Sequence, residues 1–160
     1  MPIYMKIEGV KGLVQTTGYE DQISIDSLSW GTSRNVSSFT GSAREVSSPN
    51  FSEVSCMKTL DSASQALFRN AMFGDAIPEV VISFTRDKGA GEVEAYLVTT
   101  LANVLVTNYQ LSHSGGGDVP TESFSLNFTV IKNKQTWRGT DYGAGGEDEA
   151  GYDLAKMTTA

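Results

Sequence analysis

The sequence predicts a mainly β fold, in which two sheets form a β-barrel with one short α-helix at its side. Apolar and polar residues alternate with period two in several segments, most clearly in residues 122–130, and this is the pattern of half-buried strands. Helical spacing of apolar residues occurs in one segment, residues 60–74. With 160 residues, no internal repeat and no long linker, we expect a single domain over residues 1–160.

The formal net charge of −7 argues against two classes of partner. Nucleic acids and anionic membranes both attract cationic patches, so we expect neither nucleic-acid binding nor direct membrane insertion. The first residues, MPIYMKIEGVKG, lack the basic and apolar regions of a cleaved signal peptide. We therefore expect the chain to begin in the cytoplasm and, if exported, to leave without a cleaved leader.

The first third of the chain reads as strands separated by loops. Residues 3–8 alternate and present one apolar face. In residues 22–30 the alternation slips by one position at Asp26, which predicts a β-bulge. Residues 31–50 are small and polar, which indicates a long functional loop or an extended hairpin. Residues 51–58 then resume strand character.

The predicted helix has recognisable start and stop signals. Asp61 is expected to be its N-cap, because a carboxylate there can accept hydrogen bonds from the free N–H groups of the first turn. Ala63 and Leu67 lie at helical spacing on its apolar face. Gly74 is expected to end the helix, and Pro78 prevents it from restarting.

The remainder of the chain is predicted to be strands joined by glycine-rich turns. A hairpin turn is expected over residues 87–91 and a short break at residues 102–103. Residues 138–151 are rich in glycine and acidic residues and are expected to be a loop, followed by a last short strand. The expected strands are residues 79–86, 92–101, 104–111 and 122–130.

The residue types that carry chemistry form no recognisable catalytic or metal site. The glycines at 115–117 lack the Gly-Lys-Ser/Thr ending of a phosphate loop. The acidic run at 147–149 lacks the spacing of a calcium loop. His113 lies between two serines in a flexible turn, and Cys56 is expected to be a small core residue. We therefore expect no enzyme activity, no cofactor and no metal.

Several segments, taken together in their order and spacing, resemble the Hcp family of type VI secretion tube proteins. They are MKIEGVKG (5–12), IDSLSWG (25–31), KTLD (58–61), YL (96–97), LANVLV (101–106), PTESFSL (120–126) and GYDL (151–154). This resemblance implies a phage tail-tube-like β-barrel with one helix at its side. It also implies six-membered rings that stack into a tube, inside a contractile sheath and behind a VgrG spike, with effector proteins carried in the lumen.

The resemblance also implies positions for two functional surfaces. Ser27 and Ser29 correspond to the small polar wall that lines the lumen and contacts effectors. The family's extended loop, which reaches toward the adjacent ring, corresponds to Thr40, Gly41, Ser42, Ala43, Arg44, Glu45, Val46, Ser47 and Ser48.

Two other functions are compatible with the residues. One is a monomeric β-barrel that binds a ligand such as a glycan, with Trp137 as the stacking residue. The other is a hydrolase that uses His113. Neither has a supporting motif in the sequence.

Overall fold

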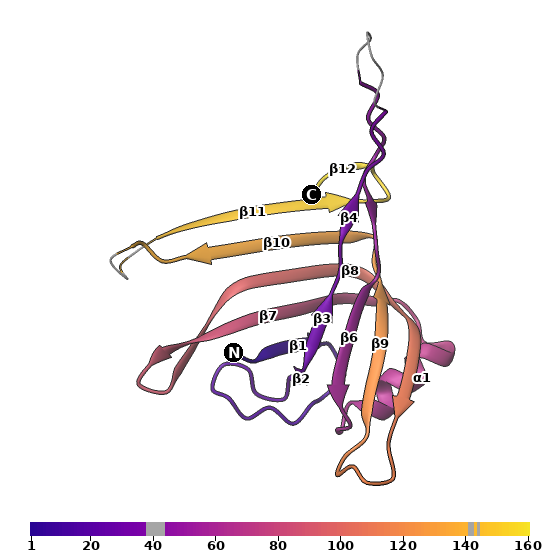
Figure 1. Cartoon of the computed structure of the whole chain (residues 1–160), viewed down its shortest axis with the longest axis vertical. Helices are drawn as coiled ribbons and strands as arrows, with labels where there is room; N and C mark the ends of the chain where they lie inside the picture. Colours follow the sequence, from indigo (N-terminus) through magenta and orange to yellow (C-terminus); the bar gives the residue numbers. More distant parts are fainter. Residues whose placement is uncertain (38–43, 141–142, 144) are drawn as a thin grey trace.

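The computed structural model describes residues 1–37, 44–140, 143 and 145–160. Two antiparallel β-sheets lie crosswise over one core, and one helix lies beside them (Figure 1). The mainly β, two-sheet prediction with one short helix is confirmed. The sheets meet where strands pass from one to the other, and the described strands do not close into a barrel.

The larger sheet, sheet A, has the strand order β12-β11-β10-β8-β7-β1-β2. Two of its hairpins, β7–β8 and β10–β11, project to one side of the body (Figure 1). Its strands are β1 (Ile3–Ile7), β2 (Ile23–Ile25), β7 (Ile77–Gly89), β8 (Glu92–Ser112), β10 (Val130–Trp137), β11 (Gly146–Asp153) and β12 (Thr158–Thr159).

The smaller sheet, sheet B, consists of β3 (Ser27–Ser29), β6 (Val54–Thr59), β9 (Thr121–Asn127) and the second half of β8, in that order. Strand β8 therefore belongs to both sheets. It pairs with β7 as far as Val104 and with β9 from Leu105 onward. The predicted break at residues 102–103 is wrong, because the chain continues as one strand of 21 residues that bends where Asn103 adopts a left-handed φ of 51°.

The phase slip at Asp26 is not a bulge. It marks the point where the chain leaves β2, which pairs with β1, and enters β3, which pairs with β6. The Asp26 N–H donates to the Met57 carbonyl at 2.8 Å and holds this corner in place. The alternation slips because the two halves of the segment face the core from different sheets.

Residues 31–37 and 44–50 form the two sides of an extended hairpin arm, which is one of the two predicted alternatives. Strands β4 (Thr32–Ser33) and β5 (Asn50–Phe51) pair at its base, and a bridge joins Val36 to Val46 further out. The arm projects away from both sheets (Figure 1). Its described part is therefore held by its own hydrogen bonds.

Helix α1 (Ser64–Phe73) begins later than predicted. Its N-cap is Ala63, which makes no side-chain capping bond, so the prediction of Asp61 as N-cap is wrong. The Asp61 carboxylate instead accepts hydrogen bonds from the Ala63 N–H at 2.8 Å and from Lys58 Nζ at 2.7 Å. Gly74 is the C-cap, as predicted.

The C-terminal third departs most from the sequence expectations. The predicted strand 122–130 ends at Asn127, and the chain then passes from sheet B to sheet A before β10 begins. The prediction of a loop over residues 138–151 is wrong for residues 146–151. These residues belong to strand β11, and every residue of β11 pairs with a residue of β10. The turn at 87–91 is tighter than predicted, and Ala90 and Gly91 adopt left-handed φ values at its tip.

The core lies between the two sheets and is closed on one side by α1. Leu67 of the helix packs among strand residues from both sheets. Cys56 is buried there, as predicted. Other fully buried apolar side chains include Met5, Ile23, Val54, Val80, Ile82, Leu101, Val104 and Leu126.

Candidate functional site

The outward face of sheet B carries small polar side chains across its whole width. Strand register places Ser29, Ser55, Ser125 and Asn108 in one row. The next row contains Ser27, Met57, Ser123 and Gln110. We call these eight residues the serine face.

The serine face follows directly from strand geometry. Successive side chains of a strand point to opposite faces, so a strand with one buried face exposes every second residue. In β6, for example, Val54 and Cys56 are buried while Ser55 and Met57 are exposed. The two sides of sheet B therefore differ: the inner side packs on the core, and the outer side, which is the serine face, is rich in hydroxyl groups.

The structure brings Ser27 and Ser29 together with serines that the sequence analysis did not select. Both predicted residues are exposed on β3, at one margin of the face. Ser55, Ser123 and Ser125 continue the same surface. The sequence could have indicated these three serines as exposed residues of the same face, because each alternates with buried residues along β6 or β9.

A buried group of charged and hydroxyl side chains lies beneath the end of sheet B. Lys58 and Glu122, whose side chains are both 0% exposed, form an ion pair across β6 and β9. Lys58 Nζ also donates to Asp61, and the Glu122 carboxylate accepts from Ser64 Oγ at 2.6 Å and from the Tyr109 hydroxyl. We call these five residues the buried polar cluster. Sequence reasoning missed it, although both charges occur in phase with apolar core residues.

The pKa values of this cluster reflect burial opposed by hydrogen bonding. Burial acts to raise the pKa of Glu122, but the hydrogen bonds from Lys58, Ser64 and Tyr109 outweigh it, so the pKa is lowered overall. Burial, together with the bond to Glu122, raises the pKa of Tyr109 to about 12. Glu122 is therefore ionised and Tyr109 neutral at neutral pH, which suits a stabilising cluster.

The structure describes only some of the residues that were predicted to lie between rings. Thr40, Gly41, Ser42 and Ala43 lie outside the described residues. Glu45 and Ser47 pair with the opposite side of the arm, since the Glu45 N–H donates to Ser37 Oγ at 3.0 Å and the Ser47 N–H donates to the Asn35 carbonyl at 2.9 Å. Arg44, Val46 and Ser48 are exposed in the same segment.

The two rival functions depend on His113 and Trp137, which lie in different parts of the described structure. His113 is exposed in the β8–β9 loop, and it has no hydrogen-bond partner among the residues that the structure describes. Trp137 ends β10, where its ring lies against Gly146 of the paired strand. Burial raises the pKa of the Cys56 thiol to about 12, which makes it a poor nucleophile.

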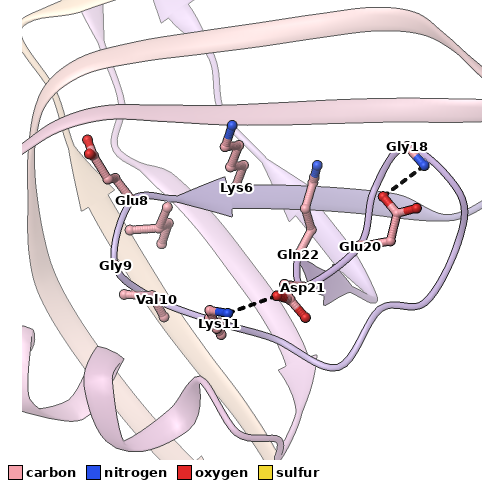
Figure 2. Close-up of a pocket in the computed structure, with 10 residues that line it drawn as sticks. Lys6, Glu8, Gly9, Val10, Lys11, Gly18, Glu20, Asp21 and Gln22 are labelled. Carbon is pink, nitrogen blue, oxygen red and sulfur yellow. Dashed lines mark hydrogen bonds and ion pairs between the residues drawn. The ribbon is translucent and has the colours of Figure 1, made fainter.

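A pocket of about 480 Å³ lies beside β1. Figure 2 shows the residues that line it, which include side chains of both charge signs. Lys11 pairs with Asp21 at 3.0 Å, and Glu20 accepts from the Gly18 N–H at 2.9 Å. Neither histidine nor cysteine lines it. The described part of the chain holds neither a cluster of three metal-ligating side chains nor a helix that could cross a membrane.

Comparisons with known proteins agree with this architecture. A family model for "Type VI secretion system effector, Hcp" matches residues 4–135. The chain is 27% identical over 130 residues to Protein hcp1 of Pseudomonas aeruginosa, a match that covers 81% of this chain and 80% of that protein.

Solved structures share the fold. The structure of a type six secretion system protein superposes with a TM-score of 0.91 at 21% identity, covering 99% of each chain. Hcp1 from Salmonella typhimurium gives a TM-score of 0.81 at 22% identity, covering 99% of this chain and 98% of that one. The chain belongs to the Hcp family of type VI secretion system proteins.

Proposed function

We propose that the protein is a structural subunit of the type VI secretion inner tube, with no catalytic role. Residues 1–160 act as a single domain, and six copies form a ring whose lumen is lined by the serine face. The observation that carries this proposal is sheet B itself, whose outward face is rich in serine, whose inward face packs on the core, and which is unpaired at both edges among the described residues.

The strand order of sheet B supports ring formation. Its four strands, β3-β6-β9-β8, are antiparallel throughout, so the two edge strands run in opposite directions. When β3 of one copy lies beside β8 of the next, the antiparallel alternation continues without inverting either copy. Repetition of one such heterologous contact closes a ring when the rotation permits.

The chemistry of the serine face suits a conduit that carries effector proteins. Short hydroxyl side chains make few strong contacts, so a passing protein is held weakly and released. Ser27 and Ser29 are the proposed effector-contact residues. The segment from Thr40 to Ser48 is proposed to bridge stacked rings.

The remaining partners follow from the same proposal. The tube assembles in the bacterial cytoplasm inside the contractile sheath, carries a VgrG spike and is exported through the type VI system. The net charge of −7 fits a protein that binds neither nucleic acid nor membrane.

Native mass spectrometry and negative-stain electron microscopy of the purified chain test this proposal. We expect hexamers and ring-shaped particles with an open centre. A species that remains monomeric from nanomolar to millimolar concentration would contradict the ring. Measured turnover of a substrate that is lost in His113→Ala would contradict the absence of a catalytic role.

A further inference from the structure

Helix α1 presents a large apolar surface to solvent. Phe68, Met72 and Phe73 are 42%, 54% and 74% exposed. Phe68 and Met72 are four residues apart, so they lie on one side of the helix, and Phe73 adjoins them at its end. We call these three residues the α1 apolar face. Contiguous exposed apolar side chains on a small protein mark an interaction surface.

This surface is not needed to hold the helix on its own chain. Ala63, Ser64 and Leu67 are the fully buried residues at this helix, and they anchor it to the core. Among the described residues, Phe68 makes one ring contact, with Tyr109 at 5.3 Å between centroids. Met72 and Phe73 are free to contact another molecule.

The position of α1 indicates what covers it. The helix packs along β8, and the ring of Phe68 contacts the ring of Tyr109 in the second half of that strand at a tilt of 42°. From Leu105 to Ser112, β8 pairs with β9 on one side, and no described strand pairs with the other side. A strand added at this open edge therefore lies next to the α1 apolar face.

We infer that the α1 apolar face is covered by the neighbouring copy of this chain in the ring, on the side that bears β2 and β3. This inference rests on the proposed function and adds a hydrophobic contact to the proposed strand pairing. One interface then combines main-chain hydrogen bonds at β8 with apolar burial at α1.

Charge supports a copy of this chain as the occupant. Arg69 is the charged residue of α1, and no described residue forms an ion pair with it. The side that bears β2 and β3 is acidic, with Glu20, Asp21 and Asp26 in or beside these strands and Lys11 paired to Asp21. Arg69 thus meets an edge on which the carboxylates of Glu20, Asp21 and Asp26 outnumber the Lys11 cation, which favours the heterologous orientation.

The test is the double substitution Met72→Gln/Phe73→Gln, measured by native mass spectrometry over a dilution series. Glutamine keeps the helix propensity of methionine, and both positions are exposed, so the far-ultraviolet circular dichroism spectrum is expected to stay unchanged. The concentration at which hexamers half-dissociate should rise about tenfold or more. Met157→Gln, at an exposed methionine far along the chain, is the matched control and should leave it unchanged.

Two outcomes separate this inference from the proposed function. If hexamers of the double variant half-dissociate at the same concentration as wild-type hexamers, the role of the α1 apolar face is overturned, but the proposed ring is not. A wild-type chain that never forms hexamers would overturn the proposed function and this inference with it.

Discussion

At the scale of residues, the buried polar cluster is the unusual feature of the core. Lys58 and Glu122 are charged, yet neither side chain reaches solvent. A buried ion pair is tolerated when hydrogen bonds satisfy both partners, and here Ser64, Asp61 and Tyr109 provide those bonds. The cluster joins β6, β9, β8 and the start of α1, so it specifies how the helix meets sheet B.

Removing one charge from this pair should be costly. In Lys58→Met the Glu122 carboxylate stays buried without its cation, and we expect a loss of about 3–5 kcal/mol in the free energy of unfolding. The double variant Lys58→Met/Glu122→Leu should lose less than the sum of the single variants, with a coupling of about 1 kcal/mol or more. Urea titrations of the wild type, Lys58→Met, Glu122→Leu and the double variant measure this double-mutant cycle. Strict additivity of the losses in the free energy of unfolding would refute the coupling.

The lowered pKa of Glu122 predicts a pH dependence of stability. Its pKa is below the unfolded value, so the ionised carboxylate stabilises the fold above the unfolded pKa. That contribution is lost as the pH falls through the folded pKa. We expect the urea midpoint to decline in acid, and the decline to be shallower in Glu122→Gln. Parallel slopes for the two proteins between pH 7 and pH 3 would argue against this assignment.

At the scale of elements, the bend in β8 is what allows one strand to serve two sheets. Asn103 adopts a left-handed φ of 51° at the bend, and its side chain is exposed. Asparagine tolerates this conformation better than β-branched residues do. We expect Asn103→Val to lower the free energy of unfolding by about 1–2 kcal/mol and Asn103→Gly to leave it nearly unchanged. Thermal denaturation distinguishes the two, and equal effects would exclude strain as the cause.

The hairpin arm supports a second prediction at this scale. The described arm makes its own hydrogen bonds and projects from the body (Figure 1). Deleting residues 36–46 and joining the ends with two glycines should therefore leave the fold and the hexamer intact but abolish ring stacking. Electron microscopy of concentrated protein would show single rings in place of tubes. Loss of the hexamer itself would mean that the arm acts within the ring.

The strand pattern was predictable where alternation is strong, as in β1 and β6. It was not predictable where the chain passes from one sheet to the other, because the shift in alternation at Asp26 has the same sequence pattern as a bulge. β11 was missed because glycine and acidic residues are poor strand formers, and its pairing with β10 is what makes it a strand. At the site, Ser27 and Ser29 came from the family resemblance, whereas the buried charges required the three-dimensional pairing.

At the scale of the whole molecule, the serine face makes a prediction about cargo. Replacing Ser27 and Ser29 by arginine places bulky cations in the proposed lumen without touching the core. We expect the rings to persist and the recovery of effector proteins with them to fall several-fold. Ser114→Arg, in the exposed β8–β9 loop, is the control. Effector recovery equal to wild type would show that this face does not contact cargo.

The serine face also bears on how such a protein can diverge. Its side chains alternate with those of the core and point to the opposite side of the sheet, so changes at the two sets should be nearly additive in stability. Selection can therefore vary the serine face at every second position of β6 and β9 while the buried positions between them stay under packing constraint. A fold conserved at a TM-score of 0.81 with 22% identity is the outcome that this separation permits.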